Sequence, residues 1–182
     1  MRGTGSHDFE VADTFVPEHH SFSVFTDVPI EPGPLYRLPF TVLTELPVTA
    51  VALGIAARVL REFAALVRTK PDGPAAAMRY AEMQAALSLA RAGIFELAAR
   101  TWDRTLSGAP LTPEERAAIT AACVQAVACL RRGAAELLAL AGMAAIRNDE
   151  PLARAGRDLS ALAAHASVSP RALSASGDLL LR

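Results

Sequence analysis

The sequence predicts an all-α protein, an antiparallel four-helix bundle preceded by a short extended segment. From residue 47 onward, apolar residues recur at the spacing of amphipathic helices, and alanine is frequent. Turns rich in proline, glycine and serine divide this region into long helical segments. The chain has 182 residues, of which 52% are hydrophobic, enough for one domain with a large core. We therefore expect an extended part over residues 1–46 and a helical bundle over residues 47–182.

The first 46 residues differ in kind from the rest. Residues 9–16 alternate between apolar and polar and are rich in strand formers, which predicts a β-strand ended by Pro17. A connector follows that neither a helix nor a central strand can accommodate, because it contains Pro29, Pro32, Pro34 and Pro39. A single strand cannot form the hydrogen bonds that its own backbone N–H and C=O groups need. It either pairs with a segment outside this chain or remains an unpaired edge.

Residues that typically begin or end helices set the bounds of the predicted helices. The first is expected over residues 47–69, ending before the turn at residues 70–74, and the second over residues 75–106, ending at Ser107 and Gly108. The third is expected over residues 112–146, since Thr112, Pro113 and Glu115 form a capping box. The fourth is expected over residues 151–166, with Pro151 in its first turn and Asn148 or Asp149 as cap. A short terminal helix follows from about Pro170.

The third predicted helix is apolar on most of its circumference. Gln125, Arg132 and Glu136 share one narrow side, whereas valine and leucine occupy most of the remainder. A helix of this kind needs neighbours on nearly all sides, so we expect a homo-oligomer formed through the second or third helix. The alternative is a monomer whose last short helices fold over this surface.

Charge and cysteine content exclude several classes of function. The net charge of −1 provides no electrostatic footprint for nucleic acid or an anionic membrane, and we expect neither partner. Cys123 and Cys129 lie on different faces of a helix, so neither a disulfide between them nor a metal pair is expected. His19 and His20 lack a third ligand at metal-binding spacing, and we expect no metal. No leader or membrane span is recognised, and the expected compartment is the cytoplasm.

Residues 151–170 place titratable groups inside an otherwise aliphatic helical pattern. At 100° per residue, Arg154, Asp158 and His165 fall within roughly 40° of one another, beside an apolar face formed by leucines. This predicts a polar seam on one side of the fourth helix. For Arg154 and Asp158 the alternative is an exposed ion pair on a solvated face. For His165 it is a histidine at a helix end or in the core.

Several segments together resemble a known family. They are RGTGSHD (residues 2–8), DTFVP (13–17), PLYRLPF (34–40), VALGIA (51–56) and AGMAAIRNDEPLARAGRDLSALAAHASVSP (141–170). The chain resembles the C-terminal part of the acyl-CoA dehydrogenase superfamily, and is most similar to its flavin-dependent monooxygenase branch. Members of that branch hydroxylate aromatic or heteroaromatic substrates with reduced flavin from a separate reductase.

The resemblance implies a partner for this chain. Residues 1–46 would be the end of a middle β-domain and its connector, and a typical member has an N-terminal helical domain and most of the β-domain before this point. Flavin, as FAD or FMN, is then expected only when those domains are supplied, for example by a partner chain. The C-terminal bundles of the family pack against each other in a tetramer, which agrees with the expected homo-oligomer. A flavin reductase is a further implied partner.

The resemblance also implies roles for the residues of the seam. The dehydrogenases place a catalytic glutamate one residue beyond the position of His165, where this chain has Ala166. No carboxylate is then available to take an α-proton from an acyl thioester. His165 matches instead the histidine that monooxygenases place beside the flavin and the substrate hydroxyl, where an imidazole could deprotonate a phenol. We therefore expect His165 to be catalytic, and Arg154, Arg157 and Asp158 to be cofactor-binding.

Three hypotheses of function follow. The chain is the C-terminal helical-bundle portion of a flavoprotein oxidoreductase of the monooxygenase type. Alternatively it is a non-catalytic helical module for oligomerisation, or an inactive remnant of that family. The residues do not identify the substrate, and they do not distinguish FAD from FMN. Apart from the argument from Ala166, they also do not distinguish hydroxylation from dehydrogenation.

Overall fold

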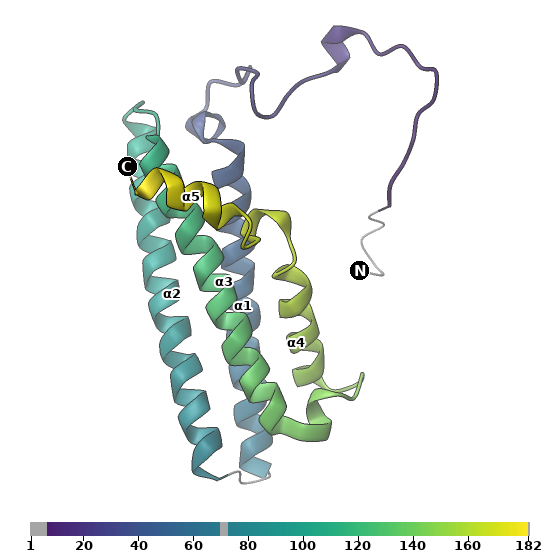
Figure 1. Cartoon of the computed structure of the whole chain (residues 1–182), viewed down its shortest axis with the longest axis vertical. Coiled ribbons are helices and arrows are strands. Elements are labelled where there is room, and N and C mark those ends of the chain that lie inside the picture. The colour runs from purple at the N-terminus through teal and green to yellow at the C-terminus, as the bar shows by residue number, and fades with distance from the viewer. Residues whose placement is uncertain (1–6, 70–72, 182) are drawn as a thin grey trace.

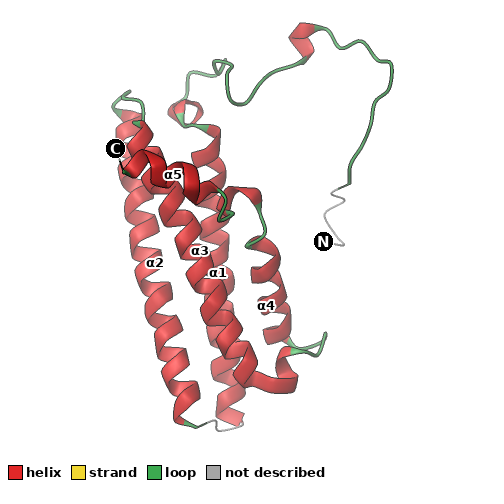
Figure 2. Cartoon of the chain, in the orientation of Figure 1, coloured by secondary structure: helices red, strands yellow, loops and turns green. Residues whose placement is uncertain are grey.

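The computed structural model describes residues 7–69 and 73–181, and in these residues helices are joined by loops without any strand (Figure 2). The long helices α1 (Phe40–Thr69), α2 (Pro74–Leu106) and α3 (Pro113–Ala141) run antiparallel along one axis (Figure 1). The shorter α4 (Pro151–Leu162) lies alongside α1, and α5 (Ala172–Leu180) crosses α3. The connections contain 3-10 turns at η1 (Glu18–His20), η2 (Pro34–Arg37), η3 (Gly142–Ala145) and η4 (Ala166–Val168). The predicted fold class, a helical bundle after an extended segment, is confirmed.

The core lies where α1 meets its neighbours, because α1 packs against α2, α3 and α4. Apolar side chains at helical spacing on each of these helices turn inward, which removes their surface from water. The largest fully buried ones include Val59, Phe63, Met83, Val127, Leu130, Leu137 and Leu159. The core is therefore one continuous cluster that all four helices share.

Helix α1 begins at Phe40, so the predictions of a helix start at Pro47 and of an extended chain up to residue 46 are wrong for residues 40–46. Val42 and Glu45 are buried, and they continue the inward-facing side of α1 into this first part. Pro47 is exposed and lies within the helix. The packing of Val42 and Glu45 outweighs the preference of proline for a first helical turn.

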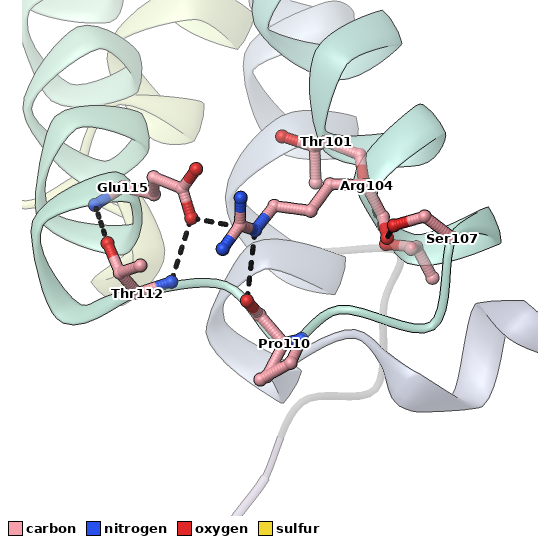
Figure 3. Close-up of polar contacts among 7 residues, drawn as sticks. Thr101, Arg104, Ser107, Pro110, Thr112 and Glu115 are labelled. Atoms are coloured by element: carbon pink, nitrogen blue, oxygen red, sulfur yellow. Dashed lines mark hydrogen bonds and ion pairs between the residues drawn. The ribbon is translucent and has the colours of Figure 1, made fainter.

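A polar clasp, which consists of Arg104, Pro110, Thr112 and Glu115, joins the end of α2 to the start of α3 (Figure 3). The Thr112 side chain accepts a hydrogen bond from the Glu115 backbone N–H at 3.2 Å, and the Glu115 carboxylate accepts one from the Thr112 N–H at 2.8 Å. The predicted capping box is therefore confirmed. Arg104 adds a hydrogen bond of 2.9 Å to the Pro110 carbonyl and an ion pair of 3.0 Å with Glu115.

Helix α3 ends at Ala141, and the predicted end at residue 146 is wrong. Gly142 adopts φ +59°, a conformation that side chains with a Cβ rarely take. The helix therefore stops at this glycine, and η3 turns the chain toward α4.

The predicted position of Pro151 in the first turn of α4 is confirmed. The N-cap is Glu150, and not Asn148 or Asp149, and its side chain makes no capping hydrogen bond. Gly156 allows α4 to approach α3 closely, since a Cβ at this position would overlap the Leu138 side chain. Beyond α4, the predicted terminal helix forms as α5, which begins at Ala172 rather than at Pro170.

The N-terminal arm, residues 7–39, leaves the bundle as an extended chain (Figure 1). The predicted strand over residues 9–16 is wrong for this chain, because a strand needs a partner and no described segment bonds to this one. Its aromatic side chains remain in solvent, with Phe9 90% and Phe15 87% exposed. Residues 2–6 of the motif at residues 2–8 lie outside the described residues.

Helix α1 is long and apolar enough, by length and composition, to cross a membrane. A third of its most apolar window is buried inside this chain (33%), and core helices of soluble bundles meet the same criterion. The contacts of α1 with α2, α3 and α4 account for only part of this composition, since most of the window is not buried.

Candidate functional site: an apolar hollow beside His165

A hollow of about 500 Å³ lies between the first half of α1 and the end of α4 with the residues that follow it. Its walls are apolar except for one imidazole ring, and they consist of Val48, Val51, Ala161, Leu162, Ala164 and His165. It is open to solvent, since Val51 and His165 are both exposed. We call this feature the His165 hollow. It offers a planar apolar group a surface with a single hydrogen-bonding side chain at its edge.

The backbone around His165 is held by local hydrogen bonds. Helix α4 ends at Leu162, and the His165 N–H donates to the Leu162 carbonyl at 2.9 Å. His165 is also the N-cap of η4, where its Nδ1 accepts a hydrogen bond from the Ser167 N–H at 3.2 Å. Because Nδ1 accepts, the neutral ring carries its hydrogen on Nε2. Nε2 is therefore a hydrogen-bond donor.

Helix α4 carries Arg154, Arg157 and Asp158 but ends before His165, so its predicted end at residue 166 is wrong. Because α4 ends before His165, the helical phase that placed Arg154, Asp158 and His165 on one seam does not apply. Arg154 and Asp158 are exposed, and no ion pair joins them in the part of the chain that the structure describes. Arg157 donates to the Asn148 carbonyl at 3.3 Å and so braces the loop before α4. None of these three lines the His165 hollow, and their cofactor-binding role stays a prediction.

Other titratable side chains do not assemble into a centre. His7, His19 and His20 are exposed on the N-terminal arm. Within residues 7–69 and 73–181, no three His, Cys, Asp or Glu side chains are placed to hold a metal ion together. Cys123 and Cys129 are both free thiols. Burial, the larger cause, and the nearby Glu45 charge raise the pKa of the Cys123 thiol to about 11, against a hydrogen bond with Thr49 that lowers it.

Sequence reasoning missed a buried carboxyl group at the start of α1. Glu45 is 4% exposed, and the Thr120 hydroxyl oxygen of α3 lies 2.9 Å from its Oε1 and 3.1 Å from its Oε2. Burial raises the pKa of Glu45, and the hydrogen bond with Thr120 partly opposes that rise. The signal was present in the sequence, because Glu45 shares the helical spacing of Val42 and Thr49. It was lost with the incorrect start of the first helix.

A second apolar surface lies outside the site, between α2 and α3. A groove of about 630 Å³ there is lined mainly by small and aliphatic side chains, among them Ala86, Leu89, Gly93, Ile94, Ala126 and Cys129. Leu89 is 77% exposed, and Phe95 and Trp102 are also exposed on α2. We call this feature the α2–α3 groove. It agrees with the excess apolar surface predicted for the second and third helices.

Comparison with known families decides the assignment of this fold. Residues 46–170, more than half of the chain, match the model of the acyl-CoA dehydrogenase C-terminal domain. The chain belongs to this family. The predicted family, read from residues such as Pro151, Arg154 and His165, is therefore confirmed.

Curated relatives of this family member are monooxygenases and hydroxylases. It is 31% identical, over 91% of its length, to an indole-3-acetate monooxygenase of Pseudomonas putida. It is 30% identical, again over 91% of its length, to a pigment production hydroxylase of a Rhodococcus species. It spans under half of these proteins, 45% of the first and 46% of the second.

Solved structures share the fold. The HsaA monooxygenase of M. tuberculosis superimposes with a TM-score of 0.72 at 23% identity, covering 82% of this chain and 41% of that one. XiaF of a Streptomyces species, solved with FADH2 and glycerol, superimposes with a TM-score of 0.73 at 22% identity, covering 92% of this chain and 46% of XiaF. The bundle is thus the architecture of part of these larger chains.

Proposed function

We propose that this bundle forms one wall of the active site of a flavin-dependent monooxygenase. The His165 hollow is that wall, and the other walls come from N-terminal helical and β-domains, in the same polypeptide or in a partner chain. The observation that carries the proposal is the position of His165. It lies at the edge of an apolar hollow, in a chain whose curated relatives are monooxygenases.

The residues of the hollow fit a flavin. Val48, Val51 and Leu162 present an apolar surface for a flat isoalloxazine ring or an aromatic substrate. Outside the hollow, on α4, Arg154 is exposed and has no ion-pair partner among the described residues, so its guanidinium is available to a phosphate group. The reduced cofactor, as FAD or FMN, would supply the two electrons with which one atom of molecular oxygen enters the substrate and the other leaves as water. A separate reductase would supply it in reduced form.

His165 would act as a hydrogen-bond donor in this reaction. Its Nδ1 accepts from Ser167, which leaves the Nε2–H to donate to an oxygen in the hollow. A donor at this position would stabilise negative charge on an oxygen atom of the substrate or the cofactor that lies in the hollow. Ala166 supplies no carboxylate beside it, which argues for hydroxylation rather than α-proton abstraction.

The α2–α3 groove supports self-association of the bundle. It presents Leu89 and other apolar side chains to solvent over a continuous surface, and a second bundle would cover them. Leu89→Glu should therefore convert a dimer or larger oligomer to a monomer in light scattering at micromolar concentration. Wild-type protein that is already monomeric would refute the association. The same groove supports a second candidate function, a non-catalytic module for oligomerisation.

Flavin retention separates the two candidates. The chain is produced alone, and also together with the N-terminal half of the Pseudomonas putida indole-3-acetate monooxygenase. Alone, it should lose flavin during gel filtration, because a flavin bound by one wall keeps most of its surface in solvent. The combined protein should retain flavin. Tight binding by the chain alone would contradict the account, and absence of flavin from the combined protein would favour the oligomerisation module.

A further inference from the structure

Glu45 has a partner that suits its neutral form. One hydroxyl group, that of Thr120, lies within hydrogen-bond distance of both carboxyl oxygens. A hydroxyl has a single hydrogen, so an ionised carboxylate would receive one shared donor for two oxygens. A protonated Glu45 needs less, because it is uncharged and can still form a hydrogen bond with the same hydroxyl group. The geometry thus satisfies the acid better than the carboxylate.

The surroundings of Glu45 contain no compensating cation. On α3 it faces Thr120 and the thiol of Cys123, and on α1 the Thr49 hydroxyl donates to its backbone carbonyl at 2.8 Å. In the described part of the chain, no charged side chain of α2, α4, η4 or α5 pairs with Glu45 or forms a hydrogen bond to it. Arg116 of α3 lies one turn before Thr120 but is exposed and forms no ion pair with Glu45 among the described residues, and Arg154, Arg157, Asp158 and Asp178 of α4 and α5 are also exposed. Ionisation of Glu45 would therefore leave a buried charge without an opposite charge.

Glu45 is one helical turn from the wall of the His165 hollow. Val48 lies three residues further along α1 and so on the same side of the helix. The turn η4, whose N-cap is His165, packs against both α1 and α3, the two helices that Glu45 and Thr120 connect. Val168 of η4 is buried in the shared core. A change in the distance between α1 and α3 at Glu45 would therefore move the two helices on which η4, and with it His165, packs.

We propose that Glu45 is a proton-dependent positioning residue for His165. The neutral acid ties α1 to α3 beneath η4, and loss of its proton loosens this contact and shifts His165 relative to Val48 and Val51. This inference adds regulation to the His165 hollow, and its meaning for catalysis rests on the proposed monooxygenase function.

Burial of Glu45 determines how the stability of the chain changes with pH. The pKa of Glu45 is higher in the folded chain than in the unfolded chain. Its contribution to stability is therefore fully present below the unfolded value and is lost as the pH rises through the folded value. Glu45→Gln keeps a donor and an acceptor for Thr120 and cannot ionise. This variant should match the wild type in acid and exceed it in stability in alkali.

The test measures hydrogen exchange and the His165 resonances of the 182-residue chain across pH. At pH 8, the opening constants of the amides of residues 42–46 and 48–51 should be at least about tenfold lower in Glu45→Gln than in the wild type, and equal at pH 4. The wild-type imidazole resonances of His165 should show a second inflection that Glu45→Gln removes. Glu96→Gln, on the exposed face of α2, should change neither the amide opening constants nor the second inflection of His165. Thr120→Val should move the second inflection to higher pH, because an ionised Glu45 loses its donor.

Two results would overturn the proposal. One is the same pH dependence of amide opening in wild type and Glu45→Gln. The other is a changed opening without any second inflection at His165, which would make Glu45 a structural residue alone. An unmoved inflection in Thr120→Val would also contradict the pairing. No flavin is present in these experiments, so failure of the monooxygenase function would leave their outcome intact and would be recognised separately by turnover.

Discussion

The α2–α3 clasp and the segment around His165 are both connections between helices, but they differ in how complete they are. In the clasp, Arg104, Thr112 and Glu115 satisfy one another and the nearby backbone within the chain. Around His165, the backbone bonds are local, whereas the side chains of His165 and Val51 in the hollow are exposed to solvent. The clasp is thus a connection whose hydrogen bonds are completed within the chain. The His165 hollow is a surface that another molecule would complete.

The largest expected loss of stability comes from a substitution in the core, against which both connections pack. Leu137→Ala removes a fully buried side chain and should lower the free energy of unfolding by about 3 kcal/mol. Leu106→Ala, on an exposed part of α2, should change it by less than about 0.5 kcal/mol. Urea unfolding followed by circular dichroism measures both. Equal effects of the two substitutions would contradict the described core.

The clasp should respond to loss of its cap. Thr112→Ala removes the side-chain acceptor for the Glu115 N–H, and should lower the free energy of unfolding by about 1 kcal/mol. Thr112→Ser keeps a hydroxyl at the same position and should restore most of that loss. If alanine and serine destabilise the chain equally in urea, the hydrogen bond is not the cause.

The ion pair of the clasp should contribute less than its cap. The side chains of Arg104 and Glu115 are 35% and 36% exposed, so solvent screens their attraction. A double-mutant cycle with Arg104→Ala and Glu115→Ala should give a coupling free energy below about 1 kcal/mol. A coupling of about 2 kcal/mol or more would mean that Arg104, rather than the capping box, holds the joint together.

The same contrast explains what the sequence could predict. The capping box at Thr112 and the helix end at Ser107 and Gly108 depend on neighbours within a few residues, and both predictions were confirmed. The start of α1 was wrong because the burial of Val42 and Glu45 depends on α3, which lies far along the chain. Local patterns specify local structure, and long-range packing can override them.

The candidate site was predictable only in part. His165 was identified from its resemblance to family members, and the structure places it at the hollow with Leu162. Its expected seam with Arg154 and Asp158 assumed a helix that continues to residue 166, whereas α4 ends at Leu162, and no capping residue in the sequence marks that end. Val48 and Val51 were not identified as site residues, since the segment that faces them is more than a hundred residues away in the sequence.

The measurement that tests the central claim most directly is turnover of the flavin-loaded combined protein with His165→Ala. Supplied with reduced flavin and the relative's substrate, indole-3-acetate, the variant should lose on the order of 100-fold in turnover. Its free energy of unfolding should stay within about 0.5 kcal/mol of the parent, because His165 is exposed. Arg171→Ala, at an exposed position before α5, serves as the control and should keep full turnover. Unchanged turnover in His165→Ala would contradict the account and leave His165 as the cap of η4.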